Sequence, residues 1–300
     1  MTMVSEVQVE AEVEELNPDV PLLQAMLQLI KRQPLGAAGL AVVILMILMA
    51  VFANFLSPYD PEANSLEHML VEPSWIFPMG TDQFGRDVLT RIIYGARTAL
   101  YVGFTAATVG SFLGLLLGVA SAYFGGRFDL IMQRVMDVFM AFPLIIIALA
   151  VVATLGTGTT NVIIAITIPF VPQCARVVRS SALAIREIPY VDAARSLGFG
   201  HSRIILRHMM PNVMAPFLIM FTSFLGQAIL LEASLSYLGM GVQEPTPAWG
   251  LMLQGGAEEY AESAPWVAIW PGVAISLAVF GFNLFGDALR DVLDPKLRSR

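Results

Sequence analysis

Cysteine, lysine and histidine are scarce in this sequence, and their scarcity excludes several classes of protein. The 300 residues include one cysteine, Cys174, so the chain forms no internal disulfide, no redox pair and no thiolate metal cluster. The only lysines, Lys31 and Lys296, do not close a glycine-rich loop that could bind nucleotide phosphates. The three histidines lack metal-ligand spacing, and no HExxH or GxSxG string occurs. We therefore expect neither a catalytic site nor a cofactor bound by this chain.

Charged residues are also few, at 14% of the chain, whereas 56% of the residues are hydrophobic and the mean hydropathy is +0.70. A soluble domain carries charge on about a quarter of its residues, so lipid must solvate much of this chain, and no nucleic-acid partner is expected. The N-terminus differs, and we interpret residues 1–21 as a disordered acidic cytoplasmic tail. Six of the 24 acidic residues lie there: Glu6, Glu10, Glu12, Glu14, Glu15 and Asp19.

Long uncharged blocks predict an all-α integral membrane protein, because a spanning helix needs about 20 mostly apolar residues. The fourth of six candidate blocks is the weakest, since it contains Pro169 and Pro172. These prolines either kink the helix or form part of a gate by freeing carbonyls beside a water-filled path. The six blocks are Leu35–Leu56, Leu100–Tyr123, Val135–Leu155, Val162–Val178, Ala215–Leu238 and Val267–Leu289.

The distribution of basic residues predicts the orientation of these spans. With six spans and both termini in the cytoplasm, only Arg86, Arg91 and Arg97 of the 17 basic residues lie outside, as the positive-inside rule requires. Without the fourth span, six arginines would lie outside. Two connections are too long to be turns, an outer segment over residues 57–98 and an inner segment over residues 179–214, and long connections usually carry function.

The sequence of the inner segment predicts a short helix with capping residues at both ends. Pro189 suits the first helical position, Asp192 suits the positive end of the helix dipole, and Gly198 suits a left-handed stop. Ala193 and Ala194 leave one face of this helix nearly bare. A second amphipathic helix is predicted from Ser202 to Met210, ending before Pro211.

The inner segment resembles the ATPase-docking loop of ATP-binding-cassette importer permeases, in which an acid and two alanines are followed by a glycine and then by a proline. Asp192 stands here for the usual glutamate, His208 for an aliphatic residue and Met210 for leucine. The resemblance implies that the docking residues are Tyr190, Asp192, Ala193, Ala194, Leu197, Gly198 and Pro211, with Ala194 pressed into an ATPase groove.

Six further segments narrow the resemblance to the second permease of the dipeptide, oligopeptide and nickel branch. It implies a type I importer fold over residues 22–300, with six transmembrane helices and a cytoplasmic coupling helix. It also implies a bacterial inner-membrane location, a homologous second permease, two ATPase subunits that hold ATP and magnesium, and an external solute-binding protein. The segments are Tyr59–Pro61, Gly80–Asp87, Tyr94–Arg97, Leu235–Gly239, Pro247–Gly250 and Gly286–Asp291.

Two features inside the predicted spans have alternative interpretations. Gly110, Gly114 and Gly118 line one helix face at four-residue spacing, and we favour close helix packing over solute binding there. Glu232 lies near the outer rim of the fifth span, either as an interfacial snorkelling acid or as a contact to a neighbouring subunit. A proton-coupled secondary transporter is the alternative function, but it would be expected to carry an acid or a histidine at the membrane midplane.

Overall fold

The computed structural model of the protein describes residues 33–293, and the predicted acidic tail, residues 1–21, lies outside this range. Within it the chain is helical apart from loops and an isolated bridge between Thr81 and Asp87. The α-helices are α3 (Pro34–Val51), α4 (Ala53–Leu56), α5 (Val88–Phe124), α6 (Gly126–Met140), α7 (Leu144–Leu155), α8 (Thr159–Arg186), α9 (Pro189–Ser196), α10 (His201–Ile204), α11 (Met214–Tyr237), α12 (Trp249–Glu259) and α13 (Trp266–Leu293). Shorter turns are η2 (Leu66–His68), a π turn η3 (Ile205–Met209) and a 3-10 turn η4 (Met210–Val213).

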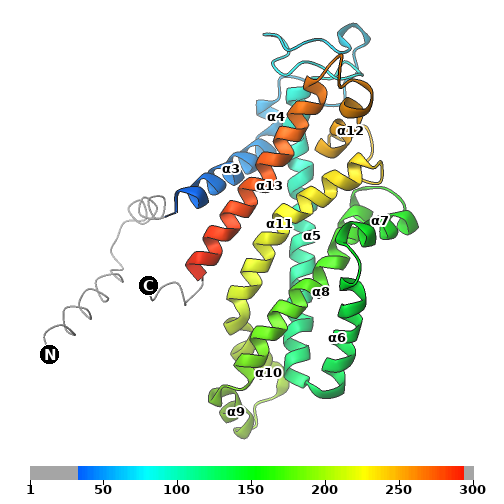
Figure 1. Cartoon of the computed structure of the whole chain (residues 1–300). Helices are drawn as coiled ribbons and strands as arrows, with labels where there is room; N and C mark the ends of the chain where they lie inside the picture. Colours follow the sequence, from blue (N-terminus) through cyan, green and yellow to red (C-terminus); the bar gives the residue numbers. More distant parts are fainter. Residues whose placement is uncertain (1–32, 294–300) are drawn as a thin grey trace, which may run out of the picture.

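Five helical segments are long and apolar enough to cross a membrane, and the bent pair α6–α7 makes a sixth when it is counted as one span. This agrees with the predicted all-α fold of six spans. Helices are the natural solution here, because in lipid each backbone polar group must be satisfied within the protein. Figure 1 shows α5 running the length of the molecule, from the loop of residues 57–87 at the top to α9 and α10 at the bottom.

Helix α5 is longer than predicted, because it begins at Val88 and spans 37 residues. The Asp87 carboxylate caps it by accepting hydrogen bonds from the backbone N–H of Thr90 (2.8 Å) and from the Thr90 hydroxyl (2.6 Å). The last ten or so residues of the predicted outer segment are therefore helical. We call residues 57–87 the outer loop and residues 187–213 the inner loop, following the predicted orientation.

Helices α5 and α8 pack against each other along the predicted glycine face. A Cβ atom added to Gly114 would lie 2.5 Å from the Cβ of Cys174, and one added to Gly110 would lie 2.8 Å from the Cβ of Phe170. A Cβ atom added to Gly118 would lie 2.6 Å from the backbone carbonyl oxygen of Ala175. No side chain fits at these distances, so the three glycines set the separation of the two helices.

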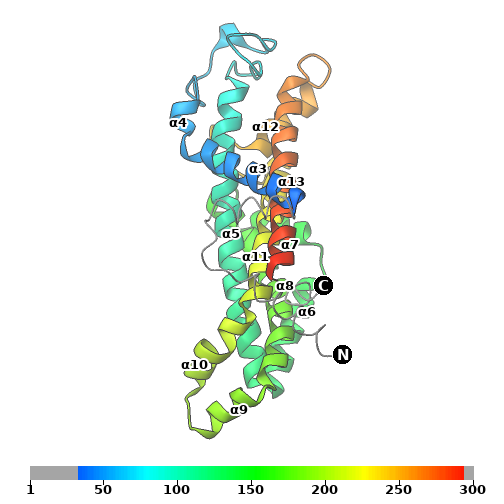
Figure 2. The ribbon, with the colours of Figure 1, turned by 90° about the vertical axis from the view of Figure 1, so that its left-hand side faces the viewer.

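A second close contact, between α3 and α13, lay outside the sequence prediction. A Cβ atom on Gly36 would lie 2.3 Å from the Cβ of Ala288, and one on Gly281 would lie 2.6 Å from the side chain of Val42. Gly39 approaches the backbone of α13 equally closely. The first and last described spans are therefore neighbours, and Figure 2 shows α3 crossing α13.

The break in the membrane spans lies in the third span and not in the fourth. Helices α6 and α7 meet at 89° around Ala141–Pro143, where Pro143 has an extended ψ of 140°. The residue before a proline avoids helical geometry, and this explains the break at Phe142. By contrast, α8 is one helix of 28 residues that contains both Pro169 and Pro172.

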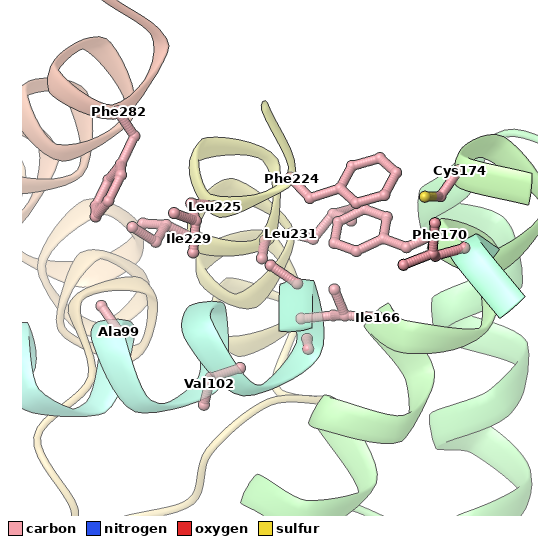
Figure 3. Close-up of a cluster of buried hydrophobic side chains, with 14 of the residues drawn as sticks. Ala99, Val102, Ile166, Phe170, Cys174, Phe224, Leu225, Ile229, Leu231 and Phe282 are labelled. Atoms are coloured by element: carbon pink, nitrogen blue, oxygen red, sulfur yellow. The ribbon is translucent and has the colours of Figure 1, made fainter. Parts of the chain in front are cut away.

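The centre of the bundle explains why α8 tolerates its prolines. Pro169 and Pro172 are buried, and the ring of Phe170 between them stacks on that of Phe224 of α11 at 4.2 Å. Figure 3 shows this stack beside Ile166 and Cys174. Prolines lack the N–H group that a helix needs, and this disfavours a helix here. Packing of α8 against α5 on one side and α11 on the other keeps it helical.

Candidate functional site

The inner loop forms the tip of the molecule at the far end from the outer loop, with α9 and α10 at its extremity (Figure 2). Helix α9 begins at Pro189 and ends in front of Gly198, whose φ is +75°. The N–H of Gly198 donates to the carbonyl of Arg195 at 2.9 Å, and that of Phe199 donates to the carbonyl of Ala194 at 3.1 Å. This is the left-handed stop that the glycine predicted.

The alanine pair of α9 is divided between two faces. Ala194 is only 4% exposed and packs, with Val191, into the protein's own core. Asp192, Ala193 and Leu197 are exposed. The prediction that Ala194 presses into another subunit is therefore corrected, because its methyl group already fills space within this chain.

The second helix of the inner loop ends at a different place from the one predicted. It does not end before Pro211, but passes through the π turn η3 and the 3-10 turn η4 into α11. Proline has no N–H to donate, and the change of helix type accommodates this loss within a continuous helical path. Pro211 is exposed in the described structure.

Tyr190 connects the two halves of the inner loop. Its hydroxyl donates to the carbonyl of His208 at 2.8 Å, and the amide of Asn212 donates to that hydroxyl at 3.0 Å and to the same carbonyl at 2.7 Å. The ring of His208 stacks on Phe199 at 6.1 Å. These contacts fix α9 against the turns η3 and η4, which lead into α11.

Two side chains that the sequence interpretation missed make contacts at the inner end of α5: Tyr123 contacts the inner loop, and Arg186 contacts α5 from the last residue of α8. The Tyr123 hydroxyl of α5 lies 2.7 Å from Nδ1 of His201, and the Arg186 guanidinium of α8 donates to the carbonyl of Ala122 at 2.8 Å. Tyr123 ends a predicted span and Arg186 fits the basic cytoplasmic pattern, so neither carried a signal of its own. The inner loop is thus attached to the end of α5.

Glu232 is 1% exposed, and its carboxylate accepts a hydrogen bond from the Ser236 hydroxyl at 2.7 Å. Both predicted interpretations of this residue, snorkelling and contact with a neighbouring subunit, required a side chain at the surface. The structure places it inside the bundle instead. Pro169 and Pro172 are also buried, so none of the three residues proposed for a gate or a subunit contact faces outward.

The outer loop is held by a cluster of buried ion pairs. Arg86 donates to Asp82 at 2.7 Å and to Glu244 at 2.7 Å, while Arg91, with no exposed surface, donates to the carbonyls of Pro61 (3.0 Å) and Pro245 (3.3 Å). Burial alone would lower the pKa of Arg86, but the hydrogen bond and charge of Glu244, together with Asp82, raise it. The cluster joins the outer loop, α5 and the connection between α11 and α12.

Within residues 33–293, no group of three histidine, cysteine, aspartate or glutamate side chains is arranged to hold a metal ion. In the outer loop, Arg86 donates to both Asp82 and Glu244, so these charged groups are paired with one another. The inner loop is the surface with the most sequence support.

Comparison with known proteins identifies the family. Residues 110–299 match the model of the binding-protein-dependent transport system inner membrane component, and residues 21–73 match the N-terminal TM domain of oligopeptide transport permease C. The chain is 42% identical over 284 residues to a peptide transport system permease protein of Brucella suis, covering 94% of this chain and 95% of that protein. It is also 42% identical over 279 residues to a dipeptide transport system permease protein of Alkalihalophilus pseudofirmus, covering 93% and 91%.

Among solved structures, the inward-facing MetNI methionine ABC transporter aligns with a TM-score of 0.55 at 19% identity, over 68% of this chain and 96% of that one. At this identity the likeness concerns the fold alone. The match over more than half of the chain, together with the two relatives, shows that the chain belongs to the family of binding-protein-dependent transport system inner membrane components.

Proposed function

We propose that this chain is one of two permease subunits of an ATP-driven importer for dipeptides or oligopeptides. The observation that carries the proposal is the near full-length similarity to peptide and dipeptide permeases, in a chain that keeps an exposed capped helix at its inner end. A homologous permease completes the path, because one chain of six spans encloses little space. Both termini lie in the cytoplasm of a bacterial inner membrane.

The inner loop is the surface proposed to bind an ATPase subunit. Its exposed residues Asp192, Ala193 and Leu197 project from α9, and Leu197 is 73% exposed although it is apolar. Two ATPase subunits hold ATP and magnesium, and their closure moves the inner loops of both permeases. The bundles then rock between inward-open and outward-open states.

The proposal is tested with the purified complex of both permeases and both ATPases in proteoliposomes, supplied with the external solute-binding protein. We expect uptake of radiolabelled dipeptide that requires ATP and is unaffected by a protonophore. The control is a complex whose ATPase subunits lack their phosphate-binding lysine. Uptake without ATP but driven by a proton gradient would contradict the proposal and favour the secondary transporter.

A further inference from the structure

The outer loop exposes large apolar side chains at its tip. Trp75 is 103% exposed and Ile76 is 67% exposed, relative to a free reference residue. Figure 1 shows this part of the chain at the upper end of the molecule, above the start of α13. An indole and an aliphatic side chain that remain in water at adjacent positions have no role in the packing of this chain, so they are available to another molecule.

The tip is held in one conformation by the residues at its base. The N–H of Ser74 donates to the carbonyl of Phe77 at 2.8 Å, and the N–H of Phe77 donates to the Ser74 hydroxyl at 3.2 Å. Tyr59 donates from its hydroxyl to the carbonyl of Ile76 at 3.2 Å, and its ring lies 5.3 Å from that of Phe77. An aromatic side chain held on a pre-formed turn loses little conformational entropy when it binds a partner.

The exposed charged side chains of residues 57–87 and 239–265 are acidic. The stretches 57–87 and 239–265 contain no lysine, and their only arginine, Arg86, is 4% exposed and paired with Asp82 and Glu244. The acids that remain exposed, with no cation paired to them within the described residues, are Asp60, Glu62, Glu67, Glu72, Glu258, Glu259 and Glu262.

We propose that Trp75 and Ile76 anchor the external solute-binding protein, through an apolar pocket on that protein rimmed by lysine and arginine. The inference rests on the proposed function, and the family itself is described as binding-protein-dependent. The exposed carboxylates of the outer loop, with Glu72 three positions before Trp75, repel an anionic lipid surface, so a positively charged protein face is the fitting occupant. Central aromatic anchors carry much of the binding energy of protein interfaces.

The test uses the complete complex in nanodiscs and, as the probe, the cargo-loaded solute-binding protein of the proposed importer. We expect Trp75→Ala to raise the Kd for the binding protein about tenfold or more, while basal ATP hydrolysis and subunit composition stay unchanged. Glu72→Lys should slow association and flatten its dependence on salt. Phe55→Ala on α4 is the matched control, because Phe55 is 88% exposed and lies outside the outer loop.

Two results would overturn the inference. Binding by the Trp75→Ala complex within twofold of wild type would show that the tip is not an anchor. Loss of the second permease from the purified Trp75→Ala complex would assign the tip to the interface between permeases. The proposed function fails separately, when the wild-type complex shows no stimulation of ATP hydrolysis by the binding protein.

Discussion

The two ends of the molecule are built differently, although both are loops attached to α5. At the outer end, ion pairs and hydrogen bonds of buried groups join Arg86 and Arg91 to residues more than a hundred positions away. At the inner end, the buried side chains of Val191, Ile204 and Met209 pack into the core, and hydrogen bonds near the surface centre on Tyr190. The outer loop is therefore held mainly by polar contacts of buried charged groups, whereas the inner loop is held by apolar packing together with hydrogen bonds near the surface.

The largest effect is expected from Arg91→Met at the outer end. The change removes a fully buried cation from beside Glu244 and Asp82 and leaves the carbonyls of Pro61 and Pro245 without their donor, which costs about 1–3 kcal/mol for each unsatisfied group. The expected result is a lower melting temperature of the purified complex and lower membrane abundance. Arg97→Met is the control, because Arg97 is exposed and bonds the Ala50 carbonyl, worth about 1 kcal/mol. Equal stability of the two variants would mean that the cluster does not hold the outer end.

At the inner end, Ala194→Glu and Ala193→Glu should separate folding from docking. Ala194→Glu places a carboxylate in a buried position and should destabilise the inner loop by about 2–3 kcal/mol. Ala193→Glu leaves the fold intact, because that side chain is exposed, but should reduce co-purification of the ATPase subunits. Proteolysis of the inner loop reports the first effect and subunit stoichiometry the second. An Ala193→Glu complex with full ATPase content and uptake would remove this face from the docking surface.

The contact between the glycine face of α5 and helix α8 lies between the two ends of the molecule. Gly114→Ala tests how tightly these helices pack. The new methyl group would lie 2.5 Å from the Cβ of Cys174, and such overpacking costs about 1–3 kcal/mol. The added change Cys174→Gly should restore part of the loss, and this coupling is measured by a double-mutant cycle of thermal stability. Leu113→Val, on the exposed side of α5, is the control. Additive effects of the two changes would show that the helices do not touch there.

The smallest effect is expected from Tyr190→Phe, which removes the hydroxyl bonded to His208 and Asn212. Since the site is partly exposed, the loss should be about 0.5–1.5 kcal/mol and confined to the inner loop. Hydrogen exchange should speed up over residues 188–213 and stay unchanged in the outer loop. Faster exchange at both ends would contradict the independence of the two regions.

The sequence predicted the membrane spans and their α-helical structure, because these depend on local composition. It also predicted the capped helix of the inner loop, because this depends on residues such as Pro189 and Gly198. It identified the fourth span as the weakest because of Pro169 and Pro172, but it did not predict the break in front of Pro143 in the third span. Burial in the assembled bundle decides which of these prolines interrupts a helix, and a single segment does not contain that information.

The remaining errors have the same origin. Ala194 and Glu232 were assigned to surfaces because their local sequence reads as exposed or interfacial, but other helices cover both residues. The outer ion cluster was missed because its members, Arg86 and Glu244, are 158 positions apart. Contacts between distant segments therefore account for what local periodicity and charge did not predict.

The unbroken course of α5 has a mechanical consequence. At 1.5 Å per residue its 37 residues form a rod about 55 Å long, with the ion cluster near its first turn and the Tyr123–His201 contact near its last. If such a rod tilts by about 10° around its midpoint, its ends move about 5 Å in opposite directions. Because α5 is one helix from Val88 to Phe124, a tilt of the whole helix moves the Tyr123 end and the Arg91 end in opposite directions, whereas a local change within the inner loop does not.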